Sequence, residues 1–401
     1  MALMHLPLDQ VRQHHLQSLI DAKAAETVTI EYKRETYGGN DDARAEFLAD
    51  VSSFANTSGG DLVIGIDAKD GVPTAFTPLT ENVDAELRRL DQMAQTGLEP
   101  RIQKLQMCGV PIDGGSVLII RAARSYNAPH RVIFKGKNRF WARSSARKYE
   151  PNVDELRAMF TLAPQLAERM HDFRMERIAR IAAGDTPVRL LDEGCLVLHV
   201  VPFSAFDLRP LFSLQTAIGL HYQFCPMGVS TAQDWRINFD GFLTLPISGS
   251  NATKQRAYLQ VFRTGAIEAV ASPIVHGQDR INSQTLDGML VKHTRIYAAL
   301  LHDCGAEPPL AVMVSLIGVK NRELVAGFGN WAIREPETVI DRDQLHCAEV
   351  ILEDVPSGDP DCAKKLHQTL DQLANAAGRS SSASFDRSGN FSLGQGGYLP
   401  R

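Results

Sequence analysis

The sequence predicts an α+β protein: a first domain built on a mixed sheet with flanking helices, followed by a second α+β domain. A strand, a helix and a second strand fall within residues 27–66, which is typical of a right-handed crossover between parallel strands. Short strand pairs around glycine-containing turns follow after residue 100. The 401 residues are 44% hydrophobic, enough for a large core and for two domains.

The first elements follow from periodicity. Residues 6–25 predict a helix, and residues 27–33 alternate between apolar and polar side chains like a half-buried strand. Asp41 or Asp42 can cap the next helix, whose apolar residues recur at helical spacing: Phe47, Leu48, Val51, Phe54 and Ala55. Gly59-Gly60 predicts the turn into a strand at 62–66.

The rest of the first domain alternates between helices and strand pairs. We expect helices at about 80–96 and 152–160, and strand pairs joining 105–108 with 117–122 and 132–134 with 139–143. The domain is expected to span residues 1–163 and to end at Pro164, which is expected to break the helix there.

The remaining chain predicts three further parts. Residues 164–187 form a linker helix, and apolar strand-like runs with a helix at about 283–301 define an α+β domain of unknown role at 188–356. Residues 357–401 are expected to hold a C-terminal helix and a flexible tail, since the segment from Ser380 is rich in Ser and Gly.

Composition excludes several classes of function. The net charge is −5, so any affinity for nucleic acid must come from a local patch. Scattered cysteines and histidines without ligand spacing predict no zinc, and the glycines form no nucleotide P-loop. The N-terminus lacks a signal pattern, and the longest apolar stretch, residues 310–319, is far short of a span of about 20 residues. We therefore expect a cytoplasmic protein without a membrane partner.

The strongest compositional signal is basic. Residues 114–149 contain nine positive charges and no acid, interleaved with aromatic residues, which suits phosphate contacts with base stacking. The alternative is a set of solvated strand faces over an aromatic core. We favour the first interpretation, in which Arg139 and Arg143 share a strand face with Trp141 while Phe140 points into the core. The candidate nucleic-acid-binding residues are Arg34, Arg131, Lys135, Lys137, Arg139, Arg143, Arg147 and Lys148.

An acidic set accompanies this patch. A parallel crossover ends both of its strands at one edge of the sheet, so it would deliver Glu31 and Asp67 there. Glu26 can join them only from the turn before the strand. Three carboxylates without a histidine suit Mg²⁺ or Mn²⁺, and Lys33 would neutralise charge in a transition state. The alternative is that Glu31 only pairs with Lys33 or Arg34.

Several ordered blocks resemble one family. The stretches IEYKRE, VSSFANTSGGDLVIGID and APHRVIFKGKNRFWARSSARKYEPNVDELRAMF resemble the core motifs of the Schlafen AlbA-type (AlbA-like) putative DNA-binding domain, over about residues 22–160. This resemblance implies a Schlafen/AlbA-like fold for the first domain and nucleic acid, either RNA or DNA, as the partner.

The resemblance also bears on chemistry. Animal Schlafen proteins include endoribonucleases that cut transfer and ribosomal RNA with two glutamates, an aspartate and a divalent metal. Glu26, Glu31 and Asp67 match these positions. The zinc-binding residues of those proteins have no match here, and a second Schlafen lobe is not evident, so a clamp around RNA would need a homodimer or another lobe.

Three functional hypotheses follow. The first is a metal-dependent endoribonuclease acting on structured RNA such as tRNA. The second is a non-catalytic DNA-binding or transcription-regulatory protein that uses the same basic patch. The third is a scaffold whose second domain senses a ligand or partner.

Overall fold

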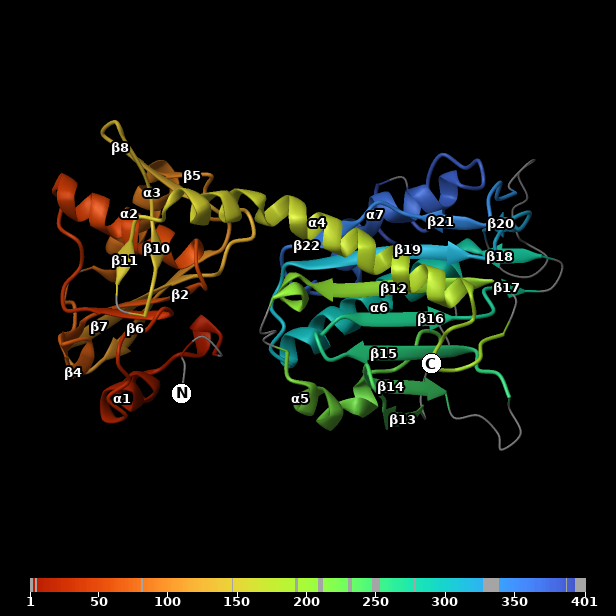
Figure 1. The fold of residues 1–401 in the computed structure, drawn as a ribbon, viewed down its shortest axis with the longest axis horizontal. Helices are drawn as coiled ribbons and strands as arrows, with labels where there is room; N and C mark the ends of the chain where they lie inside the picture. The colour runs from red at the N-terminus through yellow and green to blue at the C-terminus, as the bar shows by residue number, and fades with distance from the viewer. Residues whose placement is uncertain are drawn as a thin grey trace. The chain divides into compact units, whose positions relative to one another are not determined.

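The computed structural model describes residues 3, 6–80, 82–145, 147–191, 194–207, 212–229, 233–246, 253–276, 279–326, 339–386 and 388–393. The chain divides into two compact units, Met1–Ala167 and Glu168–Arg401 (Figure 1). No helix among these described residues is long and apolar enough to cross a membrane.

The first unit is built on a four-stranded mixed sheet in the order β1-β2-β7-β6. Its strands are β1 (Ile30–Lys33), β2 (Gly60–Ile64), β7 (Gly115–Ala122) and β6 (Leu105–Ile112). β1 and β2 are parallel, with α2 (Asp41–Ala55) between them in sequence, while β7 pairs antiparallel with both β2 and β6. The predicted parallel crossover and the predicted β6–β7 pair are therefore confirmed.

Helices cover both faces of this sheet. On one face, α2 packs Phe47 and Phe54 against Leu62 and Ile120, and α3 (Val83–Gly97) joins the same cluster. On the other face lie α1 (Gln13–Asp21) and the short helix η2 (Leu8–Gln10). Tyr32 faces the α1 side, so its strand neighbours Glu31 and Lys33 project toward α2.

The double glycine after α2 is required by close packing. Gly59 has a φ of +72°, which L-residues rarely adopt. A Cβ on Gly60 would lie 2.2 Å from the ring of Phe54 and 2.8 Å from the carbonyl oxygen of Thr29. The predicted turn is thus confirmed, and its second glycine also lets α2 approach β1 and β2.

Three small sheets surround the main one. They are the pair β3 (Ile66–Lys69) with β4 (Val72–Phe76), the set β5 (Leu98–Glu99), β8 (Arg131–Phe134) and β9 (Lys137–Phe140), and the pair β10 (Ala142–Arg143) with β11 (Lys148–Tyr149). Two predicted strands are therefore wrong in extent. The 62–66 strand ends at Ile64 because Gly65 turns the chain with a φ of +104°, and the 139–143 strand is divided at Trp141.

Helix α4 (Val153–Ala182) begins in the first unit and ends in the second. It continues through Pro164, so the helix break predicted at that proline is wrong. A proline inside a helix costs about 3 kcal/mol. The part of α4 in the second unit buries Ile178 and Ile181 against the sheet, and the free energy gained by this apolar burial offsets the cost of the proline.

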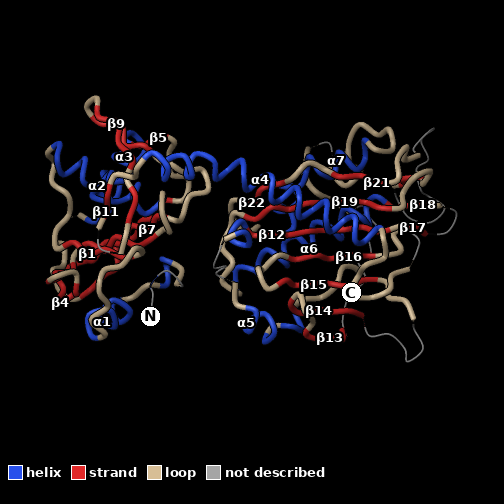
Figure 2. Tube along the Cα trace, in the orientation of Figure 1, coloured by secondary structure: helices blue, strands red, loops and turns tan. Residues whose placement is uncertain are grey.

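The second unit contains one large antiparallel sheet (Figure 2). Its strand order is β13 (Gln233–Ile237), β14 (Gly241–Pro246), β15 (Ala257–Phe262), β16 (Ile267–Ala271), β12 (Cys195–Pro202), β19 (Leu310–Ile317) and β21 (Gln344–His346), with β22 (Val350–Leu352) also paired to β19. The apolar runs predicted as strands in this region are confirmed.

Helices again cover both faces of this sheet. The C-terminal part of α4 packs on the face that includes Val197 and Tyr258. Helices α6 (Ser283–Asp303) and α7 (Asp359–Asn375) pack on the opposite face, which includes Leu196 and Leu198. The unit is completed by α5 (Leu214–Gly219), by the short helices η3 (Phe203–Phe206) and η4 (His221–Gln223), and by a small sheet of β17 (Val275–His276), β18 (Arg280–Asn282) and β20 (Glu323–Val325).

The segment after α7 packs against the unit. Ser382 and Ser384 are buried, and their hydroxyls donate to Oδ2 of Asp287 on α6 at 2.6 and 2.8 Å. A loose tail is therefore wrong for these residues. The sequence did not predict this packing, because the two serines that attach the segment are small and polar and find their partner, Asp287, only in the tertiary structure. Residues 394–401 of the predicted tail lie outside the described residues.

Candidate nucleic-acid interface

Glu31 lies in an ion cluster between β1, α2 and β10. Its Oε2 lies 2.6 Å from Nη1 of Arg143, and its Oε1 lies 3.0 Å from Nζ of Lys33. Only 14% of the Glu31 side chain and 5% of the Arg143 side chain are exposed. Two predicted site residues, Glu31 and Lys33, are thus in contact, and predicted Arg143 joins them as a buried ion partner.

Asp50 on α2 is the centre of this cluster, and sequence reasoning missed it. Its side chain is completely buried. It accepts a hydrogen bond from Nζ of Lys148 at 2.6 Å and one from the hydroxyl of Tyr37 at 2.7 Å. Nζ of Lys33 lies 3.6 Å away. A signal was present: this acid shares helical spacing with core residues Phe47 and Phe54, and such a position needs a partner.

The cluster shifts the ionisation of its carboxyl groups in opposite directions. Burial opposes the ionisation of Glu31, but Arg143 and Lys33 outweigh it and lower the Glu31 pKa. Burial, followed by the charge of Glu31, raises the Asp50 pKa despite Lys148 and Lys33. The pKa of Lys33 is raised because the charges of Asp50 and Glu31 outweigh burial. Lys33 therefore stays protonated between the two acids.

The Asn56-Thr57 pair at the end of α2 positions the basic segment. Nδ2 of Asn56 donates to the carbonyl oxygens of His130 and Trp141, and Oδ1 of Asn56 accepts from the backbone N–H of His130. Oγ1 of Thr57 accepts from the backbone N–H of Arg143 at 3.0 Å. The guanidinium of Arg143 also lies over the Phe54 ring, 4.0 Å from its centroid. These bonds fix Arg143 beside Glu31.

The other two predicted acids have separate roles. Oε1 of Glu26 accepts from the backbone N–H of Tyr32 at 3.0 Å, on the edge of β1 away from β2. Asp67 lies beyond the Gly65 turn in the β3–β4 hairpin, where its Oδ2 is 3.5 Å from the hydroxyl of Thr74. Asp67 therefore follows a turn into a new hairpin and does not lie at the end of β2 itself, while its strand β3 contacts β1. The delivery of Glu31 and Asp67 to one sheet edge stays a prediction.

These acids do not form a metal site as they are placed. Within the described residues, no group of three or more His, Cys, Asp or Glu side chains could hold a metal ion. Glu31 already has two cations as partners, and Glu26 serves a backbone N–H group. The use of Glu26, Glu31 and Asp67 as ligands for Mg²⁺ or Mn²⁺ therefore stays a prediction.

Three of the nine cations of the basic stretch pair with buried or nearly buried acids, and others are exposed. The three are Arg121 with Asp61, Arg143 with Glu31, and Lys148 with Asp50, each at 2.6 Å, with acids supplied by other elements. These cations are not free for phosphates. The expectation of one shared face for Arg139, Trp141 and Arg143 is also wrong, because β9 ends before Trp141.

The exposed group lies mainly on the β8–β9 hairpin, which projects from the first unit in Figure 1. Arg131 pairs with Glu99, Lys135 with Asp41, and Arg139 with Glu150. In these pairs the acids are 59%, 57% and 53% exposed. We call Arg131, Lys135 and Arg139 the hairpin cations. The side chain of Lys137, also predicted, lies outside the described residues.

Two further predicted cations lie off this hairpin. The Arg34 side chain is 65% exposed and lies 3.9 Å from Glu35, and Arg147 is exposed in the turn between β10 and β11. Both can meet solvent, unlike Arg143.

The structure decides the role of Trp141, which the sequence left open, and corrects that of Phe140. Trp141 packs against the core cluster of α2 and α3. Phe140 instead makes an edge contact with Phe160 on α4, at 5.7 Å between ring centroids, and the Phe160 side chain is 58% exposed. The expectation of Phe140 as core is therefore wrong. The Phe140–Phe160 pair therefore joins the half-buried last residue of β9 to an exposed ring on α4.

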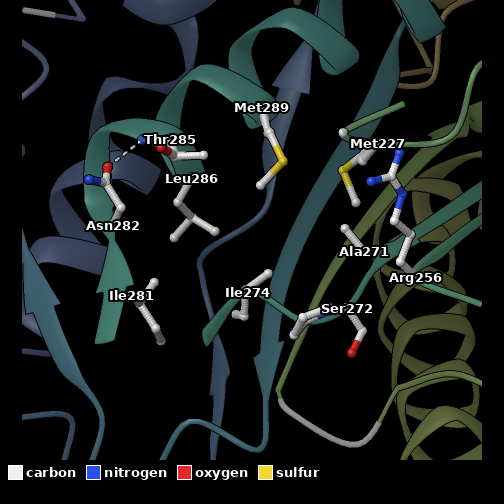
Figure 3. A pocket seen from close by; sticks show the side chains of 12 residues that line it. Met227, Arg256, Ala271, Ser272, Ile274, Ile281, Asn282, Thr285, Leu286 and Met289 are labelled. Carbon is white, nitrogen blue, oxygen red and sulfur yellow. Dashed lines mark hydrogen bonds between the residues drawn. The ribbon is translucent and has the colours of Figure 1, made fainter. Parts of the chain in front are cut away.

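The second unit contains a separate pocket of about 340 Å³ (Figure 3). Its wall is mainly apolar, with Met227, Ile274, Leu286 and Met289 among its residues, and the exposed Arg256 lies at one side. Apolar walls with a few polar groups are typical of small-molecule sites. No sequence signal pointed to this pocket, because its residues come from separate strands and one helix.

A protein-family model matches part of the chain. The model described as "Schlafen, AlbA_2" matches residues 26–152, the part of the chain that carries the ion cluster and the hairpin cations. Residues 26–152 form a Schlafen AlbA_2 domain. The family resemblance inferred from the sequence is confirmed for this domain, which points to nucleic-acid binding without specifying an activity.

Comparisons with other proteins add little on function. The DIP2311 protein of Corynebacterium diphtheriae is 19% identical with a TM-score of 0.27, covering 37% of this chain and 28% of that protein. The N-terminal domain of a putative ATP-dependent DNA helicase RecG-related protein of Nitrosomonas europaea is also 19% identical, with a TM-score of 0.26, covering 34% of this chain and 90% of that domain. No curated protein matched the chain.

Proposed function

We propose that the Schlafen AlbA_2 domain binds nucleic acid through the hairpin cations. The observation that carries this proposal is that Arg131, Lys135 and Arg139 pair only with exposed acids among their described ion partners. Exposed ion pairs contribute little stability, about 0–1 kcal/mol each. Phosphates can therefore replace the acids at small cost, whereas Arg143 and Lys148 would resist exchange because their partners, Glu31 and Asp50, are nearly or completely buried.

The Phe140–Phe160 pair favours RNA as the partner, and structured RNA such as tRNA in particular. An exposed ring can stack on an unpaired base, and structured RNA presents such bases in loops and bulges. Duplex DNA keeps its bases stacked and would use only the cations. The alternative of a DNA-binding or regulatory protein predicts equal affinity for duplex DNA and for structured RNA.

The test is a titration of labelled tRNA and duplex DNA, followed by fluorescence anisotropy at several salt concentrations. Replacing Arg131 and Arg139 with Gln should weaken binding and reduce the slope of log affinity against log salt by about two. The matched control is Lys23→Gln, an exposed cation after α1 on the other face of the sheet. An unchanged slope in the double variant would exclude these residues as phosphate contacts.

A metal-dependent endoribonuclease is the second candidate. It is supported by the three acids at the positions that the family resemblance implies, and by Glu31 lying beside Lys33. The test is incubation of labelled tRNA with Mg²⁺, Mn²⁺ or EDTA, using the protein and its Glu31→Gln and Asp67→Asn variants. Cleavage that requires metal and is lost in both variants supports this candidate. Binding without cleavage under every condition would reject it and leave the first proposal intact.

A further inference from the structure

The edge strand β13 of the second unit exposes an unusual amount of apolar surface. Among the described residues it is the last strand at its edge of the sheet. Trp235 and Ile237 on this strand are 38% and 58% exposed, and Phe239 at the following turn is 93% exposed. Exposed apolar edge strands are prone to pair with another chain, and proteins normally protect them with charges, prolines or bulges.

The hairpin geometry shows which backbone groups are available. Asn238 and Gly241 exchange backbone hydrogen bonds at 3.0 and 3.3 Å, so they form a hydrogen-bonded pair. Such pairs alternate along an antiparallel ladder, and Arg236 and Asp234 therefore direct their backbone groups toward β14. Trp235 and its strand neighbours at 233 and 237 direct theirs outward. In agreement with this direction, the backbone N–H of Trp235 donates to the side-chain Oδ1 of Asp234 at 3.0 Å and not to β14.

We propose that two copies of this chain associate by antiparallel pairing of β13 with β13. With the two-fold axis at Trp235, the two copies of Trp235 lie opposite each other as a hydrogen-bonded pair, which agrees with the outward direction of the Trp235 backbone groups. The same register places Asp234 of each copy opposite Arg236 of the other copy, so two such charge pairs form. Positions of this kind are non-hydrogen-bonded pairs, where side chains approach most closely and opposite charges are stabilising.

The charge pattern is the reason to favour a second copy over another partner. The strand reads Asp234-Trp235-Arg236, a sequence that is complementary to itself in the antiparallel direction but not in the parallel one. Both charged side chains are exposed, and Arg236 otherwise donates to the carbonyl oxygen of Pro187 at 3.1 Å. Trp235 projects from the other face of the strand, away from the two charged side chains, and its ring stacks on that of His221 with 4.7 Å between the ring centroids. This stacking holds the indole in place for contact across the axis.

This inference goes beyond the proposed function, since it involves only the second unit. The experiment measures mass by analytical ultracentrifugation over a wide concentration range. The unmodified protein should form a dimer. Arg236→Asp places Asp opposite Asp at both positions, and Asp234→Arg places Arg opposite Arg. Each should raise the dimer dissociation constant at least about tenfold.

The double variant D234R/R236D reverses both charges and should restore dimer formation. The matched control is Lys364→Asp, an exposed charge reversal on α7, which should leave the dissociation constant unchanged. Ile237→Pro removes one outward N–H donor and should also weaken the dimer, and circular dichroism verifies that each variant is folded. A monomer at every concentration, or a dimer insensitive to either single reversal, would overturn the proposal.

Discussion

At the scale of single residues, the first unit depends on a buried set of charges. Arg143 reaches Glu31 across the end of β1, and its guanidinium stacks on Phe54. Lys148 serves the completely buried Asp50 in the same way. Such pairs add little over a well-packed apolar core, but the loss of one partner leaves a buried charge without compensation.

We expect Arg143→Met to lower the free energy of unfolding by about 2 kcal/mol. The loss of stability is limited because Glu31 keeps its ion pair with Lys33, whose Nζ lies 3.0 Å from Oε1. Urea denaturation measures the change in the free energy of unfolding. The double variant Glu31→Gln with Arg143→Met should cost less than the sum of the two single variants, since it removes both charges. Simple additivity would show that the pair contributes no coupling.

A second buried ion pair, in the second unit, should make stability depend on pH. Burial opposes the ionisation of Glu268, but the hydrogen bonds from Arg177 and His199 lower its pKa to about 2. The hydroxyl of Tyr258 also donates to it at 2.8 Å. A lowered pKa means that the carboxylate stabilises the fold above its unfolded pKa of about 4.5, and that this is lost as the pH falls toward 2.

Between pH 5 and pH 2 we expect Glu268 alone to account for a loss of about 3 kcal/mol in unfolding free energy. Glu268→Gln should be destabilised at pH 7, because Arg177 and its neighbours lose the charged partner, and should show a flatter pH profile. The measurement is guanidinium denaturation at a series of pH values. Parallel profiles for the two proteins would contradict the assignment.

At the scale of elements, the contact between α2 and the strands of the first unit is set by Gly60. Overpacking a core of this kind costs about 1–3 kcal/mol. We expect Gly60→Ala to fall at the upper end of this range, since a Cβ would meet both a ring and a backbone oxygen. Thermal denaturation measures the effect. Gly39→Ala is the control, because a Cβ there has no neighbour within 4 Å. Equal effects at the two glycines would contradict the packing argument.

At the scale of the whole molecule, the two units have separate cores. We therefore expect two unfolding transitions in guanidinium. Gly60→Ala should move only the transition of the first unit, and Glu268→Gln only that of the second. Domain-specific labels, such as Trp141 and Trp235 fluorescence in single-tryptophan variants, distinguish them. A single transition that both variants shift equally would show that the units unfold together.

The sequence by itself determined the α+β class, the parallel crossover and the strands β12, β14, β15 and β19 of the second unit. It also indicated the family of the first domain. These features depend on local information: apolar periodicity of two or 3.6 residues, glycine turns and ordered motifs. The same patterns correctly paired β6 with β7 and β8 with β9.

Only the tertiary structure decided the roles of the charged residues. Nine cations without a nearby acid looked like one free surface, yet Asp61, Glu31 and Asp50 neutralise three of them from other elements. In the parallel register that pairs Glu31 with Leu62, a strand carried past Gly65 would have taken Asp67 beyond the level of Glu31. The positive φ of that glycine instead begins a new hairpin, whose strand β3 contacts β1. Periodicity specifies which face a side chain takes, but its partner depends on which distant segments the core brings together.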